Sequence, residues 1–110
     1  MHYANVRLGY NGRHLFADLY GEIDHHSAVS IRQTIDAELF RLRPEMLILN
    51  LEGISFMDSS GLGLVIGRVK AAEHLGATVK VSGASAATMR IFSLSGLERL
   101  GNLKIEGAYS

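Results

Sequence analysis

EMLILNLEG (residues 45–53), followed closely by SFMDSSGLGLVIGR (55–68), is the stretch that decides the fold. The first segment is a short apolar run with a sharp polar end, which is typical of a strand buried inside a sheet. The second holds one acid, two adjacent serines and three glycines, and then becomes apolar with helical spacing. We therefore predict a central strand followed by a helix, with a pair of serines where the helix begins.

The segment before this stretch is predicted to be a helix over residues 24–42, because apolar side chains recur there every three or four positions. Asp24 or Ser27 is expected to cap it. Its buried face is expected to comprise Ala28, Ile31, Ile35, Leu39 and Leu42.

The chain after this stretch continues the alternation of helix and strand. The helix that begins near Asp58 is expected to end at Gly76. Residues 77–83 read as a strand, residues 85–96 as a helix capped by Ser85 and ended by Gly96, and residues 102–107 as a final edge strand. The apolar stripe expected along the middle helix is Leu62, Val65, Ile66, Val69, Ala72 and Leu75.

The N-terminal segment is predicted to form a β-hairpin. Residues 5–10 and 14–23 alternate like strands and flank Asn11-Gly12, a strong turn pair. Strand–helix–strand units pair in parallel through right-handed crossovers, and the hairpin adds an antiparallel strand. The fold class is therefore α/β: a mixed β-sheet of four to five strands with helices mainly on one face, in a single domain over residues 1–110.

The composition limits the classes of partner and of chemistry. The formal net charge is zero, which argues against nucleic acid and against anionic membranes. The absence of cysteine removes disulfides and thiolate metal sites and fits a cytoplasmic protein. No apolar run is long enough for a signal peptide or a membrane span. We expect no cofactor.

Enzyme motifs match the serine stretch poorly. A hydrolase nucleophile elbow needs G-x-S-x-G, but the residues around Ser59 are M-D-S-S-G. Gly61, Gly63 and Gly67 are spaced one residue too widely for the dinucleotide fingerprint, and the Walker pattern is absent. The D-H-H cluster at residues 24–26 has no second ligand set, so we predict no metal site and no catalytic residue.

The glycines of the middle helix point to a surface role. A helical wheel places Gly63, Leu64, Gly67 and Ala71 opposite the apolar stripe, with Arg68, Lys70 and His74 around them. Glycine inside a helix costs about 1 kcal/mol relative to alanine. This face is either an ordinary exposed surface or a docking surface that a partner approaches closely.

The start of the same helix offers two hydroxyls. Asp58 is expected to be the N-cap, with Ser59 and Ser60 in the first turn. A phosphate here would add about −1.5 to −2 charges and would oppose a docked protein without reshaping the fold. The wheel alone places Ser60 outward and Ser59 toward the buried side.

Three segments together resemble one family. GEIDHHSA, LNLEGISFMDSSGLGLVIGR and IFSLSGL are similar to the STAS fold and, more narrowly, to the anti-sigma factor antagonists of spore-forming bacteria. The resemblance runs from about residue 5 to residue 100. Unlike those relatives, which usually finish with a further amphipathic helix, this chain ends with LGNLKIEGAYS.

The resemblance implies a regulator that is not an enzyme. It would bind an anti-sigma factor that is also an ATP-dependent serine kinase, and so release the sporulation sigma factor. The kinase would phosphorylate Ser59 and a serine phosphatase would reverse this. The docking surface expected from the helical wheel and the resemblance together consists of Glu22, Asp24, His25, Asp58, Ser60, Gly61, Gly63, Leu64, Gly67, Arg68 and Ala71. The alternative is a small STAS module that binds a nucleotide or a lipid near the same helix start.

Overall fold

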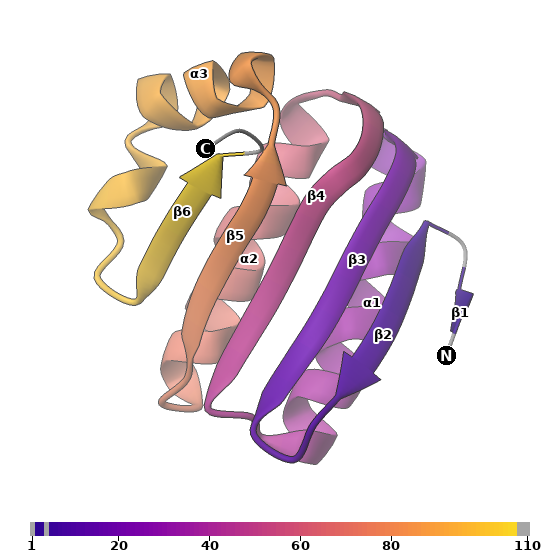
Figure 1. Ribbon diagram of the computed structural model, residues 1–110, viewed down its shortest axis with the longest axis vertical. Coiled ribbons are helices and arrows are strands. Elements are labelled where there is room, and N and C mark those ends of the chain that lie inside the picture. Colours follow the sequence, from indigo (N-terminus) through magenta and orange to yellow (C-terminus); the bar gives the residue numbers. More distant parts are fainter. Residues whose placement is uncertain (1, 4, 108–110) are drawn as a thin grey trace.

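The computed structural model describes residues 2–3 and 5–107, and its centre is one mixed sheet whose strands lie in chain order (Figure 1). The first two pairings are antiparallel and the remaining three are parallel. The strands are β1 (His2–Tyr3), β2 (Val6–Tyr10), β3 (His14–Ile23), β4 (Met46–Met57), β5 (Thr78–Ala84) and β6 (Leu103–Gly107). The predicted α/β class is confirmed. The two-residue β1 was not predicted, and β4 runs four residues beyond the expected end.

Three helices follow β3, β4 and β5: α1 (His25–Leu42), α2 (Ser59–His74) and α3 (Ala86–Ser95). A short 3-10 turn, Leu97–Arg99, precedes β6. Helices α1 and α2 lie side by side on one face of the sheet, and α3 lies beyond the carboxyl end of β5 (Figure 1). No helix in the described residues has the length and apolar character needed to cross a membrane.

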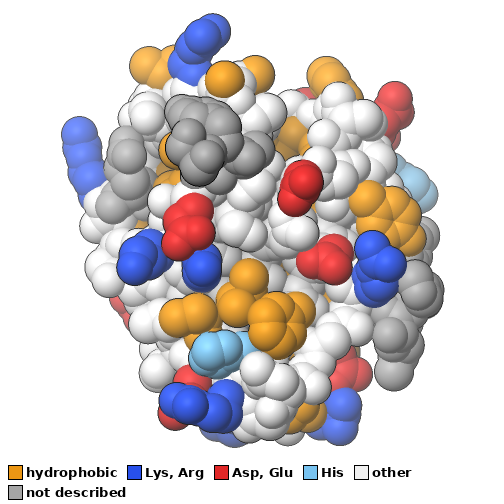
Figure 2. All heavy atoms as spheres, in the orientation of Figure 1, with side chains coloured by type: hydrophobic (Ala, Val, Ile, Leu, Met, Phe, Trp, Pro, Cys, Tyr) orange, Lys and Arg blue, Asp and Glu red, His pale blue; other side chains and the backbone are white. Residues whose placement is uncertain are grey.

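The two faces of the sheet differ because strand side chains alternate. In β3, Leu15, Ala17 and Leu19 are buried beneath the helices, together with Leu47 and Leu49 of β4. The opposite face carries no helix, and Figure 2 shows hydrophobic side chains gathered beside a histidine there. The half-buried residues of this open face include His14, Phe16, Met46 and Ile48.

Local side-chain hydrogen bonds fix where the helices begin. Asp24 is the N-cap of α1: its carboxylate accepts from the backbone N–H of Ser27 at 2.9 Å, and the Ser27 hydroxyl accepts from the Asp24 N–H at 2.9 Å. This reciprocal pair is a capping box, so both expected residues take part. Ser85 caps α3 and Gly96 ends it, as predicted.

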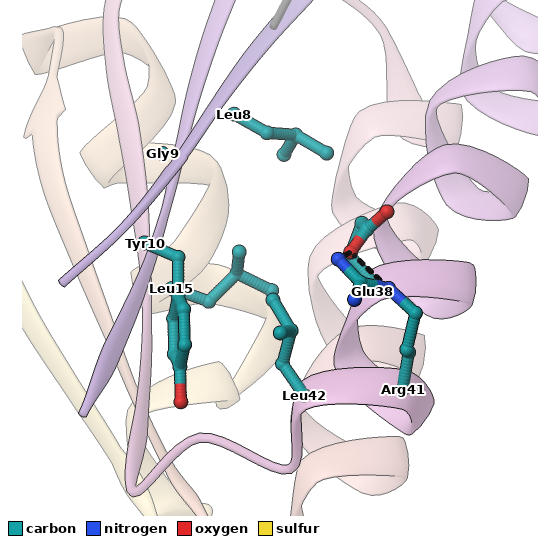
Figure 3. A pocket seen from close by; sticks show the side chains of 7 residues that line it. All are labelled: Leu8, Gly9, Tyr10, Leu15, Glu38, Arg41 and Leu42. Carbon is teal, nitrogen blue, oxygen red and sulfur yellow. Dashed lines mark hydrogen bonds and ion pairs between the residues drawn. The ribbon is translucent and has the colours of Figure 1, made fainter. Parts of the chain in front are cut away.

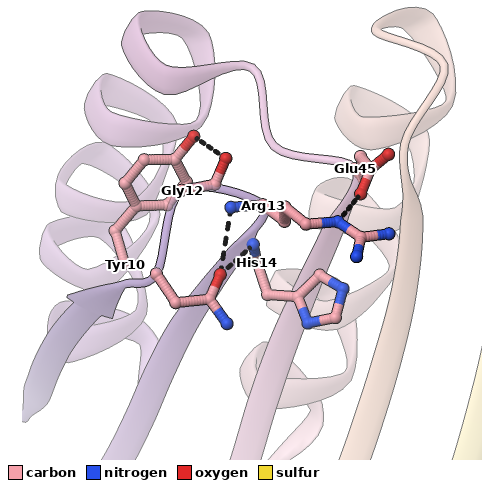
Figure 4. A network of polar contacts seen from close by, with 6 residues as sticks. Tyr10, Gly12, Arg13, His14 and Glu45 are labelled. Atoms are coloured by element: carbon pink, nitrogen blue, oxygen red, sulfur yellow. Dashed lines mark hydrogen bonds and ion pairs between the residues drawn. The ribbon is translucent and has the colours of Figure 1, made fainter.

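The predicted hairpin turn forms at the end of the sheet remote from these helix starts. The side-chain oxygen of Asn11 accepts from the backbone N–H groups of Arg13 and His14, at 3.0 and 2.7 Å (Figure 4). Gly12 has φ of +94°, which favours glycine. Arg13 contacts Glu45 at 2.6 Å, so the turn is tied to the amino end of β4.

Candidate functional site

The predicted site residues meet at the carboxyl ends of two neighbouring parallel strands. Glu22 pairs with Phe56 and Ile23 with Met57 in the register of β3 and β4. The backbone N–H of Asp58 then donates to the carbonyl of Ile23 at 3.2 Å. The turn that holds Glu22, Asp24 and His25 therefore lies beside the turn that begins α2, and all three of these side chains are exposed.

Asp24 is held in its charged form by its capping role. The Ser27 backbone N–H, followed by the Ser27 hydroxyl, lowers the pKa of Asp24 below its ordinary value. The carboxylate also lies at the positive end of α1. This side chain is therefore a fixed negative group on the exposed edge of the site.

Asp58 plays the matching role for α2. Its carboxylate accepts from the backbone N–H of Ser60 at 2.8 Å, and its own backbone is extended. Ser59 is the first helical residue and is exposed, whereas Ser60 is half-buried. The outward placement of Ser60 and inward placement of Ser59 expected from the wheel were wrong.

A shallow groove of about 200 Å³ runs between α1 and α2 from these helix starts. It collects residues from both helices, including several of the predicted docking residues. Its lining consists of His25, Ala28, Val29 and Arg32 of α1, and Ser60, Gly63, Leu64, Gly67 and Arg68 of α2. The groove therefore places Ser60, Gly63 and Gly67 of α2 on one continuous surface with α1.

The glycines of α2 fall into two kinds. At Gly63 and Gly67 an added Cβ would have no atom within 4 Å, so nothing inside the protein requires glycine there. At Gly61 an added Cβ would overlap Cγ of Met57, and Gly61 is buried. Gly61 was expected on the docking surface, but it is a packing residue under the helix start.

Leu64 and Arg68 were expected to face solvent, and both expectations were wrong. Each retains 5% of its exposure, because α1 packs against the side of α2 that the wheel left open. Helix α2 is thus buried on two sides, by the sheet and by α1. Both residues still line the groove, while Ala71 is half-buried and lies outside it.

Arg68 is buried together with a carboxylate from α1. Its Nε lies 2.8 Å from Oδ1 of Asp36, an ion pair that joins the two helices. Neither of these atoms has a hydrogen bond of acceptable geometry, and Nη1 of Arg68 is likewise buried without one. Burial raises the pKa of Asp36, although the charge of Arg68 opposes this.

Apart from His25, the residues of α1 that line the groove were not predicted from the sequence. Ala28, Val29 and Arg32 follow His25 at intervals of three, four and seven residues, which is the spacing of one helix face. That spacing was visible in the sequence. What was not visible was that this face borders α2.

Two further observations bear on ligand binding. Among the described residues, no group of three or more His, Cys, Asp or Glu side chains is placed to hold a metal ion. A separate hollow of about 210 Å³ lies between β2, β3 and the last turns of α1, and none of the predicted site residues lines it (Figure 3). Its lining is Leu8, Gly9, Tyr10, Leu15, Glu38, Arg41 and Leu42.

Comparison with known proteins gives a consistent result. The family model described as STAS domain matches residues 6–106. An anti-sigma F factor antagonist of Lysinibacillus sphaericus is 43% identical over 79 residues, which cover 72% of this chain and 68% of that protein. A protein of the same name from Paenibacillus polymyxa is 35% identical, over 78% of this chain and 74% of its own.

Solved structures agree with the sequence relatives. The anti-sigma factor antagonist SpoIIAA in its unphosphorylated form has a TM-score of 0.77 and 32% identity, covering 91% of this chain and 86% of that one. The Bacillus cell fate determinant SpoIIAA in its phosphorylated form has a TM-score of 0.73, also at 32% identity, covering 91% and 89%.

Proposed function

This chain belongs to the STAS domain family, and we propose that it is an anti-sigma factor antagonist whose binding is controlled by phosphorylation of Ser59. The partner is an anti-sigma factor that is also an ATP-dependent serine kinase. Binding releases a sporulation sigma factor, and a serine phosphatase restores the unmodified form. The protein acts by binding and has no catalytic role of its own.

The observation that carries the proposal is the exposed hydroxyl of Ser59 at the start of α2. A kinase needs an accessible hydroxyl, and Ser59 is more exposed than Ser60. Asp58 holds the first turn in place through its bond to the Ser60 N–H, so the backbone that presents Ser59 is fixed.

The open glycines support docking on the same helix. Gly63 and Gly67 reduce helix stability by about 1 kcal/mol each relative to alanine, and no internal contact explains them. A partner backbone approaching α2 closely would explain both. Glu22, Asp24 and His25 lie on the neighbouring turn and extend this surface.

Phosphorylation would act on this surface by charge. A phosphate on Ser59 adds about −1.5 to −2 charges beside Asp58 and against a docked protein. The helix N-terminus tolerates an anion, so the free fold is preserved. A penalty of about 3 kcal/mol in the complex corresponds to roughly a hundredfold weaker binding.

A small-ligand role is less well supported. The groove at the helix starts holds about 200 Å³. Pockets for drug-sized ligands hold about 300–1,000 Å³ and enclose most of the ligand. A nucleotide would remain largely exposed here, and titration with nucleotides or fatty acids in the absence of protein partners should give no saturable binding.

The first test is phosphate transfer from the cognate kinase. We expect ATP and the kinase to add one phosphate to the wild type and to Ser60→Ala, but none to Ser59→Ala, because Ser59 is exposed whereas Ser60 is half-buried. Intact-protein mass spectrometry measures this. If Ser59→Ala still accepts a phosphate and Ser60→Ala does not, the modified residue is Ser60 and the proposed site is wrong.

A further inference from the structure

The groove between α1 and α2 carries positive charge that the described protein does not balance. Arg32 and Arg68 both line it, and no Asp or Glu is among the lining residues. Asp36 is the one carboxylate paired with Arg68, so two guanidinium groups share a single counter-charge. In the described part of the chain, Arg32 has no ion-pair partner.

Arg68 has unused hydrogen-bonding capacity in a buried position. Its side chain is 6% exposed, and its Nε is engaged at 2.8 Å by Asp36, but its buried Nη1 has no hydrogen-bond partner. Buried donors without partners are uncommon in folded proteins and need an explanation. Burial lowers the pKa of Arg68, Asp36 opposes this, and Arg32 adds to it, as expected for two neighbouring cations.

The shape of the groove suits a carboxylate on a short apolar stem. Ala28, Val29 and Leu64 provide apolar walls, while Gly63 and Gly67 leave their side of the groove without side chains. Ser60 lies at the α2 end of the groove, where its backbone N–H is already bonded to the Asp58 carboxylate. A free phosphate ion has no apolar stem and would leave these apolar walls uncovered.

We propose that this groove receives an acidic side chain of the protein partner, a glutamate or an aspartate, whose carboxylate binds between Arg32 and Arg68. The identity of the partner as an anti-sigma factor rests on the proposed function. The charge of the groove and the class of group it binds rest on the residues described above. The α1–α2 groove is then the place where the partner's acid is recognised, separate from the Ser59 switch.

The first experiment compares two charge-removing variants in partner binding. Arg32→Gln removes a groove cation, whereas Lys104→Gln removes an exposed cation of β6 that does not line the groove. Because charge-assisted hydrogen bonds are the strong ones, we expect Arg32→Gln to weaken binding about tenfold and to reduce its salt dependence. Lys104→Gln should bind like the wild type. Equal affinities for both variants would overturn the proposal.

The second experiment needs no partner protein and leaves Arg68 in place, since its replacement would leave Asp36 buried and unpaired. The Nε–H signals of the arginines are followed by NMR while acetyl-Ala-Ala-Glu-Ala-Ala-amide is added to the full chain. We expect saturable shifts at Arg32 and Arg68, weaker in Arg32→Gln, and none with the peptide in which Gln replaces Glu.

Similar shifts with both peptides, or no shifts with either, would overturn the acidic-group assignment. The two experiments also separate this inference from the proposed function. If the wild type binds no anti-sigma factor while the glutamate peptide still shifts both arginines, the function is wrong and the groove stands. If the wild type binds its partner but Arg32→Gln binds equally well, the groove is wrong and the function stands.

Discussion

At the scale of single residues, Ser59 and Ser60 show what a helical wheel can and cannot predict. The wheel assumed one buried face, set by the stripe from Leu62 onward. Helix α2 has a second buried side against α1, which turns Ser60 inward and leaves Ser59 exposed. The same error misplaced Leu64 and Arg68. The motif resemblance had selected Ser59 independently of any wheel.

The glycines of α2 give a prediction at this scale. We expect Gly63→Ala to raise the free energy of unfolding by about 1 kcal/mol, because alanine favours helix and its Cβ meets nothing. Its affinity for the partner should fall. Gly61→Ala is the matched contrast, because overpacking against Met57 should lower stability by about 1–3 kcal/mol. Urea unfolding measures both, and a stability loss in Gly63→Ala would contradict the open-surface reading.

At the scale of elements, the sequence located helices better than the contacts between them. The caps at Asp24, Asp58 and Ser85 are local signals, and the structure has all three. Four of the five residues predicted for the buried face of α1 are buried and the fifth, Leu42, is half-buried, because periodicity reports which side meets the sheet. Arg32 was missed and Arg68 was misplaced because the packing of α1 on α2 joins residues far apart in the chain.

The cap of α1 predicts a pH dependence. Since the folded pKa of Asp24 lies below its ordinary value of 3.8, its charge stabilises the fold above that pH. This contribution is lost as the pH falls through the lower folded pKa. Asp24→Asn keeps a capping oxygen but cannot titrate. Unfolding free energies measured from pH 7 to pH 2 should therefore differ between the two proteins at pH 7 and converge in acid; a constant difference would exclude the effect.

At the scale of the whole molecule, the candidate binding site and the stabilising hairpin turn lie at opposite ends of the sheet. The helix starts and the groove lie at the carboxyl ends of β3 and β4, whereas the Asn11 turn and the Arg13–Glu45 pair lie at the other end (Figures 1 and 4). The order of strands and helices was predicted from the sequence because each element has its own periodicity and turn signals. The two-residue strand β1 and the full length of β4 were not predicted, because both depend on pairing with neighbouring strands.

This separation predicts that stability and binding can be changed independently. Asn11→Ala removes two hydrogen bonds to backbone N–H groups, so we expect the free energy of unfolding to fall by about 1 kcal/mol. Affinity for the partner should be unchanged, because distant sites act additively. Urea unfolding and calorimetric titration of the same preparation measure the two quantities. Weakened binding in this variant would mean that the ends are coupled.

The backbone bond between Asp58 and Ile23 has a consequence for the length of the chain. It aligns the first residues of α1 and α2, and thereby sets how far Ser59 lies from the α1 side of the groove. One residue advances a strand by about 3.3 Å and reverses its side chains. A single insertion or deletion between Gly53 and Asp58 would therefore displace the Ser59 hydroxyl from its present position beside α1, although every side chain of the candidate site would still be present. The number of residues between Gly53 and Asp58 therefore constrains the site as strongly as the identity of its residues does.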